Sequence, residues 1–265
     1  MGELAHRLGQ LAARSLQSES SHILKTAGAN KRGLSLRLDA TLRQSHDMRV
    51  FGLGTLASLS SRQRYARFTN SMHAVYNAME TRLDSSPSPP LQVVWARFGH
   101  SLRREPSLRA DLAEVGCEPQ PAGHTEATSR YVQAIHDAAD SDGEVGGARL
   151  LGHVYTRYFA DLFGGQALAL PTRLALDLSA RSPRHYDFGE FGSKRRESIE
   201  AVYAAINAAT EGLPEEALEE IVQETRRAFA HNVEVYSEEG RLYSDSAHGA
   251  FKMASGYVRH TMSRR

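Results

Sequence analysis

The chain has 265 residues, of which 41% are hydrophobic and 24% are charged, and its formal net charge at pH 7 is +1. This composition suits a globular protein with a substantial core, and the small net charge gives no general attraction to nucleic acid or to a membrane. The single cysteine, Cys117, excludes an internal disulfide, and no apolar run approaches the roughly 18 residues of a transmembrane helix.

Residues 1–33 resemble an organellar presequence. They are rich in Arg, Lys, Ser, Ala and Leu, they contain only two acids, Glu3 and Glu19, and their leucines recur near helical spacing. Two interpretations stay open: a targeting segment for a mitochondrion or plastid, or a short surface helix before the domain.

From Ser35 onward the apolar spacing is helical, and no run of β-branched residues alternates with polar ones. The predicted helices are Ser35–Arg49, Ser61–Leu83, Gln92–Arg104, Glu126–Ala139, Arg149–Phe163, Gln166–Ala180, Ser193–Ala209 and Pro214–Glu239. Clusters of Pro, Gly and Ser separate many of them. We therefore expect one all-α, multi-helical domain over residues 34–240, followed by a C-terminal basic extension over residues 241–265.

The most informative stretch covers residues 149–176. Its apolar residues form one helical stripe, and Arg157 and Asp161 lie opposite the stripe, one turn apart. The adjacent pair Gly164 and Gly165 then weakens the helix. The glycines indicate either tight packing against a neighbouring helix, or a flat ligand lying on bare backbone, with Asp161 placed to organise water or protons.

This stretch contains YTRYFADLFGGQ (155–166), which resembles the distal-helix motif of heme oxygenases. RYVQAIHDAAD (130–140) resembles the helix that precedes the distal helix in this family, and RRAFAHNVEVYSEE (226–239) resembles its last core helix. The resemblance covers residues 34–240 and implies a single-domain, heme-oxygenase-like helical bundle.

The resemblance also assigns roles on the distal side of a heme. Asp161, with Arg157, matches the group that orders distal water, and Tyr76 matches a tyrosine that supports this aspartate. Tyr155, Gly164 and Gly165 match family positions beside the heme. Phe163 stands where a small residue is usual, and its ring is expected to narrow the pocket.

The proximal side departs from the family pattern. Family members carry a histidine ligand on the first helix, followed by an M-R-x-F-x-x-G element that here begins at Met48. Counting back without a gap places Asp39 at the ligand position, whereas a gapped register places His46 there. We favour Asp39, and His46 would be a metal ligand only if heme is bound.

The positions that anchor the heme propionates also differ. Where the family has basic residues one turn apart, this chain has Ile199 and Tyr203. The basic run 194–196 lies about one turn earlier, and Arg32, near a family lysine, is expected to contact a propionate.

The leading hypothesis is therefore an organellar pseudoenzyme. It would lack efficient heme cleavage and act through protein contacts, as an accessory or structural subunit of a larger complex. The alternative is an active heme oxygenase that converts heme and O2 to biliverdin, CO and Fe2+, with electrons from ferredoxin or a reductase and His46 as ligand. Under both hypotheses we expect a mitochondrial or plastid protein, soluble or peripherally associated with a membrane, that does not bind nucleic acid.

Overall fold

The computed structural model describes residues 27–45, 48–120, 124–145, 147–238 and 242–263. Every regular element in these ranges is helical, which confirms the predicted all-α class. The elements are η1 (Ala29–Lys31), α2 (Gly33–Ser45), α3 (Met48–Ser58), α4 (Arg62–Asp84), α5 (Pro89–Leu102), α6 (Glu105–Glu114), α7 (Glu126–Val145), α8 (Leu150–Ala160), η2 (Asp161–Gly165), α9 (Gln166–Leu176), η3 (Arg184–Tyr186), α10 (Gly189–Ser193), α11 (Arg195–Thr210), α12 (Glu215–Ser237) and α13 (Leu242–Met262).

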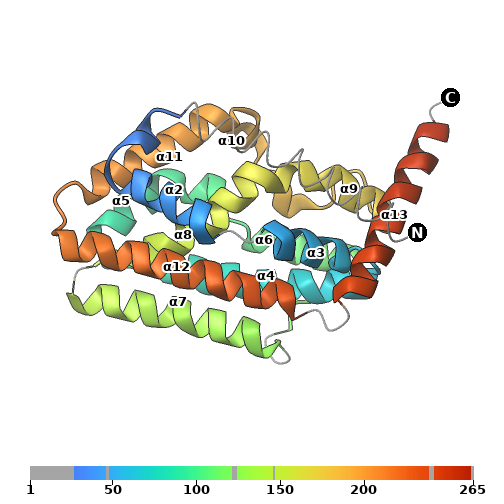
Figure 1. Cartoon of the computed structure of the whole chain (residues 1–265), viewed down its shortest axis with the longest axis horizontal. Coiled ribbons are helices and arrows are strands. Elements are labelled where there is room, and N and C mark those ends of the chain that lie inside the picture. Colours follow the sequence, from blue (N-terminus) through green and yellow to red (C-terminus); the bar gives the residue numbers. More distant parts are fainter. Residues whose placement is uncertain (1–26, 46–47, 121–123, 146, 239–241, 264–265) are drawn as a thin grey trace.

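Helix α8 lies at the centre of the bundle, where it contacts α2, α4, α5, α7 and α12 (Figure 1). The prediction gave this helix one apolar stripe with Arg157 on the opposite face. That prediction was wrong in one respect, because every residue from Leu150 to Phe159 is buried. A helix that is covered all round must satisfy its polar side chains inside the protein. Arg157 and Asp161 therefore belong to the core of the molecule.

Two helices begin at places where no local sequence signal predicted a helix start. The predicted helix Ser35–Arg49 is divided between α2 and α3, and α6 was not predicted. Helix α6 starts at Glu105 because the buried Glu80 carboxylate of α4 accepts hydrogen bonds from the backbone N–H groups of Arg104, at 2.6 Å, and Glu105, at 3.2 Å. A helix N-terminus needs such acceptors, and here they come from a distant part of the chain.

The predicted break at residues 140–147 also lies partly inside a helix, since α7 continues to Val145. Asp142 of α7 accepts hydrogen bonds from the backbone N–H groups of Arg149, at 2.7 Å, and Leu150, at 2.9 Å, at the start of α8. Within the predicted break, the Asp142 carboxylate therefore caps the N-terminus of α8.

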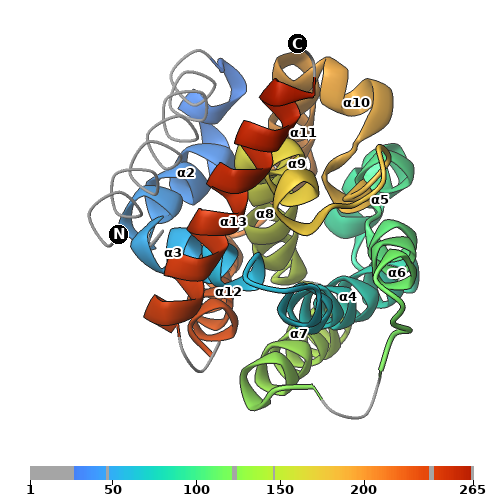
Figure 2. The same ribbon diagram turned by 90° about the vertical axis from the view of Figure 1, so that its right-hand side faces the viewer.

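Helix α13 crosses one end of the bundle and packs against α3 and α9 (Figure 2). These residues belong to the predicted C-terminal basic extension, for which no helix was predicted. None of the helices in the described ranges is both long and apolar enough to cross a membrane.

Candidate functional site

The central helix changes its winding at the predicted glycine pair. Residues Asp161–Gly165 form one π-helical turn, η2, between α8 and α9. A Cβ atom on Gly165 would lie 2.8 Å from Cδ1 of Tyr186, so the ring of η3 packs directly on this backbone. The close approach that the sequence predicted at Gly165 is therefore made by a side chain of the protein itself.

The three residues predicted to be catalytic lie together in the core. Tyr76 of α4 donates a short hydrogen bond to Asp161, and Arg157 lies 3.6 Å from the other carboxylate oxygen of Asp161. Burial raises the pKa of Tyr76 well above its ordinary value, so the hydroxyl stays protonated and acts as the donor. Tyr76, Arg157 and Asp161 are called the distal cluster below.

A fourth residue completes the distal cluster. The Arg157 guanidinium donates from Nη1 to Oδ1 of Asn232, on α12, at 2.8 Å, and its carbon lies 5.2 Å from the centre of the Tyr76 ring. Asn232 was missing from the predicted site, although it is the asparagine of the AF-x-x-N-V pattern noted for the last core helix. Its distance from Arg157 along the chain explains why spacing alone did not reveal the contact.

The predicted ligand position, Asp39, has hydrogen-bond partners within the protein. Its side chain is 1% exposed, and its Oδ1 accepts hydrogen bonds from the hydroxyls of Tyr155 and Tyr203, each at 2.5 Å. Its Oδ2 accepts a bond from Nδ2 of Asn30, also at 2.5 Å. Burial raises the pKa of Asp39, and the three hydrogen bonds oppose this increase.

These contacts join positions that the resemblance placed around a heme. Asp39 stands at the ligand position in the ungapped register, Tyr155 on the distal helix, and Tyr203 at a position expected to anchor a propionate. Burial raises the pKa of both tyrosines, so both hydroxyls stay protonated and donate to the carboxylate. We call Asp39, Tyr155, Tyr203 and Asn30 the Asp39 cluster.

Aromatic rings fill the space next to the Asp39 cluster. The centre of the Phe159 ring lies 4.8 Å from that of Tyr155, 4.8 Å from that of Tyr203 and 5.7 Å from that of Phe163. All four side chains are at most 5% exposed. Phe163, predicted to narrow a heme pocket, belongs to this group of rings. Between α2 and the distal helix, the described residues therefore present packed rings and a hydrogen-bonded carboxylate, which is a different donor from the imidazole that commonly ligates heme iron.

The remaining predicted site residues belong to neither cluster. His46 lies outside the described residues, and the Arg32 side chain is exposed just before α2. Of the basic run at the start of α11, Lys194 and Arg196 are exposed and Arg195 is half-buried, whereas Ile199 is fully buried. Gly164 is partly buried within η2.

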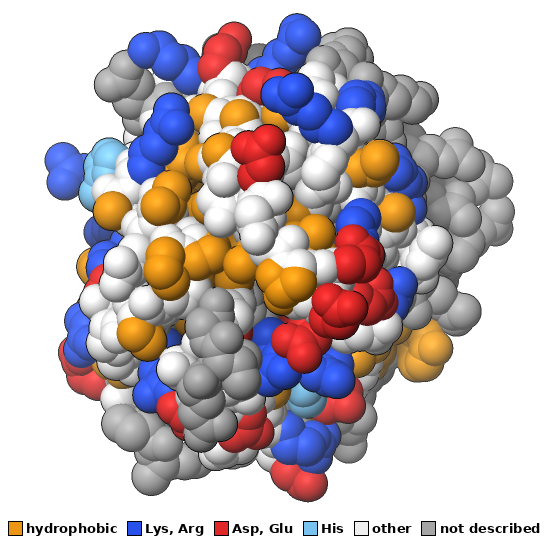
Figure 3. Space-filling model, turned by 90° about the vertical axis from the view of Figure 1, so that its left-hand side faces the viewer, with side chains coloured by type: hydrophobic (Ala, Val, Ile, Leu, Met, Phe, Trp, Pro, Cys, Tyr) orange, Lys and Arg blue, Asp and Glu red, His pale blue; other side chains and the backbone are white. Residues whose placement is uncertain are grey.

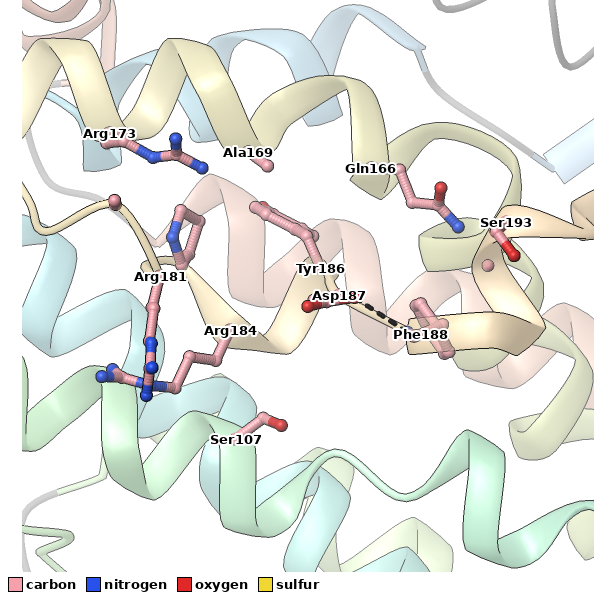
Figure 4. Close-up of a pocket in the computed structure, with 14 residues that line it drawn as sticks. Ser107, Gln166, Ala169, Arg173, Arg181, Arg184, Tyr186, Asp187, Phe188 and Ser193 are labelled. Atoms are coloured by element: carbon pink, nitrogen blue, oxygen red, sulfur yellow. Dashed lines mark hydrogen bonds between the residues drawn. The ribbon is translucent and has the colours of Figure 1, made fainter.

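A separate pocket of about 720 Å³ lies beside α9, between that helix and residues 180–193 (Figure 4). Its lining includes Arg173, Arg181 and Arg184 but none of the predicted site residues. Two of these arginines hold the surrounding segment, because Arg173 Nε donates to the Ser182 carbonyl at 3.1 Å and Arg184 Nη1 donates to the Ser182 hydroxyl at 3.0 Å.

A second, shallow pocket lies at the start of α12, where Glu215, Glu216, Glu219 and Glu220 gather with Arg149 and Arg227. Figure 3 shows acidic side chains grouped beside basic ones at this end of the molecule. Arg37 binds Glu215 at 2.8 Å and Glu219 at 2.6 Å, so part of this acidic charge is already paired. Among the described residues, no group of three His, Cys, Asp or Glu side chains is arranged to hold a metal ion.

Comparison with known proteins matches this helical bundle to one family. A sequence model described as heme oxygenase matches residues 33–238. The chain is 27% identical over 218 residues to a heme oxygenase of Rhodella violacea, which covers 77% of this chain and 86% of that protein. It is 29% identical over 181 residues to heme oxygenase 1 of Bos taurus, which covers 67% of this chain and 60% of that protein. This chain thus spans about three fifths of the bovine relative.

The fold agrees with this match. A crystal structure of heme oxygenase-2 from Synechocystis, in complex with heme and NO, superposes with a TM-score of 0.67 at 24% sequence identity, covering 80% of this chain and 87% of that chain. The molecule is thus an all-α domain with a heme-oxygenase-like fold. The chain belongs to the heme oxygenase family, as the three motifs predicted.

Proposed function

We propose that this member of the heme oxygenase family does not cleave heme efficiently and acts through protein contacts. It would serve as an accessory or structural subunit of a larger complex in a mitochondrion or plastid. The main support for this proposal is that the Asp39 carboxylate accepts hydrogen bonds from the hydroxyls of Tyr155 and Tyr203.

The physical reason is the cost of opening the Asp39 cluster. A heme in this place would have to displace the two tyrosine hydroxyls and leave a buried carboxylate without donors, which is costly in a low-dielectric core. It would also have to move the ring of Phe159, which lies 4.8 Å from the ring of Tyr203. Neither cost is offset by a ligand at position 39, because a short carboxylate does not replace imidazole beneath the iron.

The distal cluster persists for reasons that need no heme. The bond from Arg157 to Asn232 joins α8 to α12, and the bond from Tyr76 to Asp161 joins α4 to η2. Loss of any of these partners would leave a buried polar group unsatisfied. Packing alone therefore accounts for these residues. The presequence-like segment 1–33 supports an organellar location, and it lies mostly outside the described residues.

The alternative is an active heme oxygenase, and the distal cluster is the observation that favours it. Tyr76 and Arg157 both contact Asp161 on the distal helix, as the family resemblance requires. In this alternative His46 binds the heme iron, and ferredoxin or a reductase supplies electrons for conversion of heme and O2 to biliverdin, CO and Fe2+.

A turnover assay separates the two functions. The purified chain is incubated with heme, O2 and a ferredoxin and reductase pair, and biliverdin is measured beside the heme oxygenase of Rhodella violacea as positive control. We expect no biliverdin above a protein-free control, and no change with His46→Ala. Catalytic turnover that is abolished by His46→Ala would overturn the proposal and establish the alternative.

The protein-contact part of the proposal has its own test. The tagged chain is isolated from organelles under native conditions, and its size is compared with that of the purified monomer. We expect a larger assembly whose size does not change in His46→Ala. A monomer in the organelle extract would contradict a subunit role.

A further inference from the structure

Helix α13 carries most of the large hydrophobic side chains that are exposed in the described part of the chain. Eight such side chains are exposed among the described residues, and five of them belong to this single helix. They are Tyr243 (68% exposed), Phe251 (58%), Tyr257 (39%), Val258 (58%) and Met262 (71%). A concentration of this kind marks an interaction surface, whereas scattered apolar residues do not.

The orientation of α13 is fixed by two glycines on its inner face. A Cβ atom on Gly249 would lie 1.8 Å from the carbonyl oxygen of Leu56 in α3, and one on Gly256 would lie 2.4 Å from that of Leu174 in α9. The backbone of α13 therefore packs closely against the backbones of α3 and α9 at these two positions, and its opposite face points away from them. Phe251, Val258 and Met262 follow each other at intervals of seven and four residues, so they form one stripe away from the bundle.

Positive charge borders this stripe. Lys252 and Arg259 each follow a stripe residue by one position, so both lie along the same side of it. Asp245 is the only acid in α13, and it is paired with Arg64 of α4 at 2.8 Å. The exposed face of α13 thus combines apolar side chains, tyrosines and cations without a free carboxylate.

We propose that α13 binds to the surface of an anionic lipid bilayer, lying in the plane of the interface. Phe251, Val258 and Met262 would enter the acyl boundary, and Lys252 and Arg259 would contact lipid phosphates. Figures 1 and 2 show α13 at one end of the described part of the molecule, on its outside. This proposal does not depend on whether the chain binds heme.

A lipid surface fits this face better than a second copy of the chain does. A two-fold contact through α13 would bring Lys252 and Arg259 of both copies to one interface without an acid on either face, and like charges at an interface oppose binding. Anionic headgroups supply the missing negative charge, and the bilayer receives the apolar stripe.

The test uses the full chain and vesicle flotation. Vesicles of phosphatidylcholine alone are compared with vesicles that also contain phosphatidylglycerol. We expect binding only with the anionic lipid and weaker binding as salt rises. The double variant Phe251→Ser/Met262→Ser should lower the bound fraction about tenfold, and Lys252→Gln/Arg259→Gln should remove the preference for anionic lipid. Val93→Ser is the matched control, because Val93 is 54% exposed on the distant helix α5.

Further outcomes decide between occupants of this face. Each variant is first compared with the unmodified chain by thermal unfolding. Phe251, Arg259, Met262 and Val93 are exposed and Lys252 is half-buried, so we expect these substitutions to leave the fold unchanged. Equal binding of the α13 variants and Val93→Ser would overturn the proposal. So would binding that is lost only on changing Leu8 and Leu11 of the presequence-like segment. A dimer in light scattering that Phe251→Ser converts to a monomer would also overturn it, in favour of a second copy.

Discussion

At the scale of single residues, Asp39 is the residue on which the proposed loss of heme cleavage rests. A carboxylate in the core is stable only when its oxygens accept hydrogen bonds, and here two tyrosines and an asparagine supply them. Tyr203 comes from α11 and Tyr155 from α8, so one carboxylate on α2 joins three helices. This carboxylate thus holds the three helices together.

The substitution Tyr203→Phe tests this structural role. It removes one donor and leaves the buried Asp39 oxygen with fewer hydrogen bonds, so we expect a loss of about 1–3 kcal/mol in the free energy of unfolding. Urea denaturation measures the loss, with Tyr243→Phe as control, since that tyrosine is 68% exposed. If both substitutions changed the free energy of unfolding equally, the Tyr203 hydroxyl would not stabilise the folded state through Asp39.

Glu80 predicts a dependence of stability on pH. Burial is the main cause that raises its pKa to about 7 from an ordinary value of 4.5. Between about pH 4.5 and pH 7, Glu80 is therefore protonated in the folded state and ionised in the unfolded state. As pH rises through this window, the contribution of Glu80 to the free energy of unfolding falls.

The variant Glu80→Gln isolates the pH dependence that Glu80 causes, because glutamine cannot ionise. We expect the free energy of unfolding of the variant, relative to that of the unmodified protein, to rise between pH 5 and pH 8. Parallel pH profiles for the two proteins would exclude titration of Glu80 in the folded state as a cause.

At the scale of elements, the π-helical turn η2 joins α8 to α9 within the core. Asp161 begins the turn and bonds to Tyr76, whereas Gly165 ends it against the Tyr186 ring. π-turns inside α-helices are frequent at functional sites, and this one places a carboxylate next to a buried arginine. The turn is kept in shape by packing contacts of the chain itself.

Gly165→Ala tests that packing. Its new Cβ would meet Cδ1 of Tyr186 at 2.8 Å, so the ring must move, and we expect destabilisation of about 1–3 kcal/mol. Gly212→Ala is the matched control, because no atom lies within 4 Å of a Cβ at that position. Thermal unfolding compares the two, and Tyr186→Leu should partly rescue Gly165→Ala. A similar melting temperature for both alanine variants would contradict the close contact.

The predicted elements show what local sequence reveals. Periodicity predicted α4, α8, α11 and α12, because each has an apolar pattern of its own. It did not predict α6, since that helix begins on a carboxylate from α4, 24 residues away from Arg104 in the chain. It assigned no structure to α13, whose buried residues are Ser246, Gly249, Ala250, Met253 and Gly256. Met253 is the one large apolar residue among them, so the buried face gives a weak apolar signal.

At the scale of the whole molecule, the family fold is present, and Asp39 and Tyr203 stand at the positions that the resemblance assigns to a heme ligand and a propionate anchor. The positions of Asp39 and Tyr203 were predicted from the family pattern, and so was the departure of both from the usual residue types. Their mutual hydrogen bond was not predicted, because it joins residues 164 positions apart. The three ordered motifs identified the family, since they lie in helices that form the core with or without heme.

The most direct test of the central claim is a titration of the purified chain with hemin, followed by absorption spectroscopy. With the Asp39 cluster closed, we expect no saturable complex with a histidine-ligated Soret band, and no difference between the unmodified chain and His46→Ala. A tight one-to-one complex with that band, abolished by His46→Ala, would contradict the account and show that the cluster opens to admit heme.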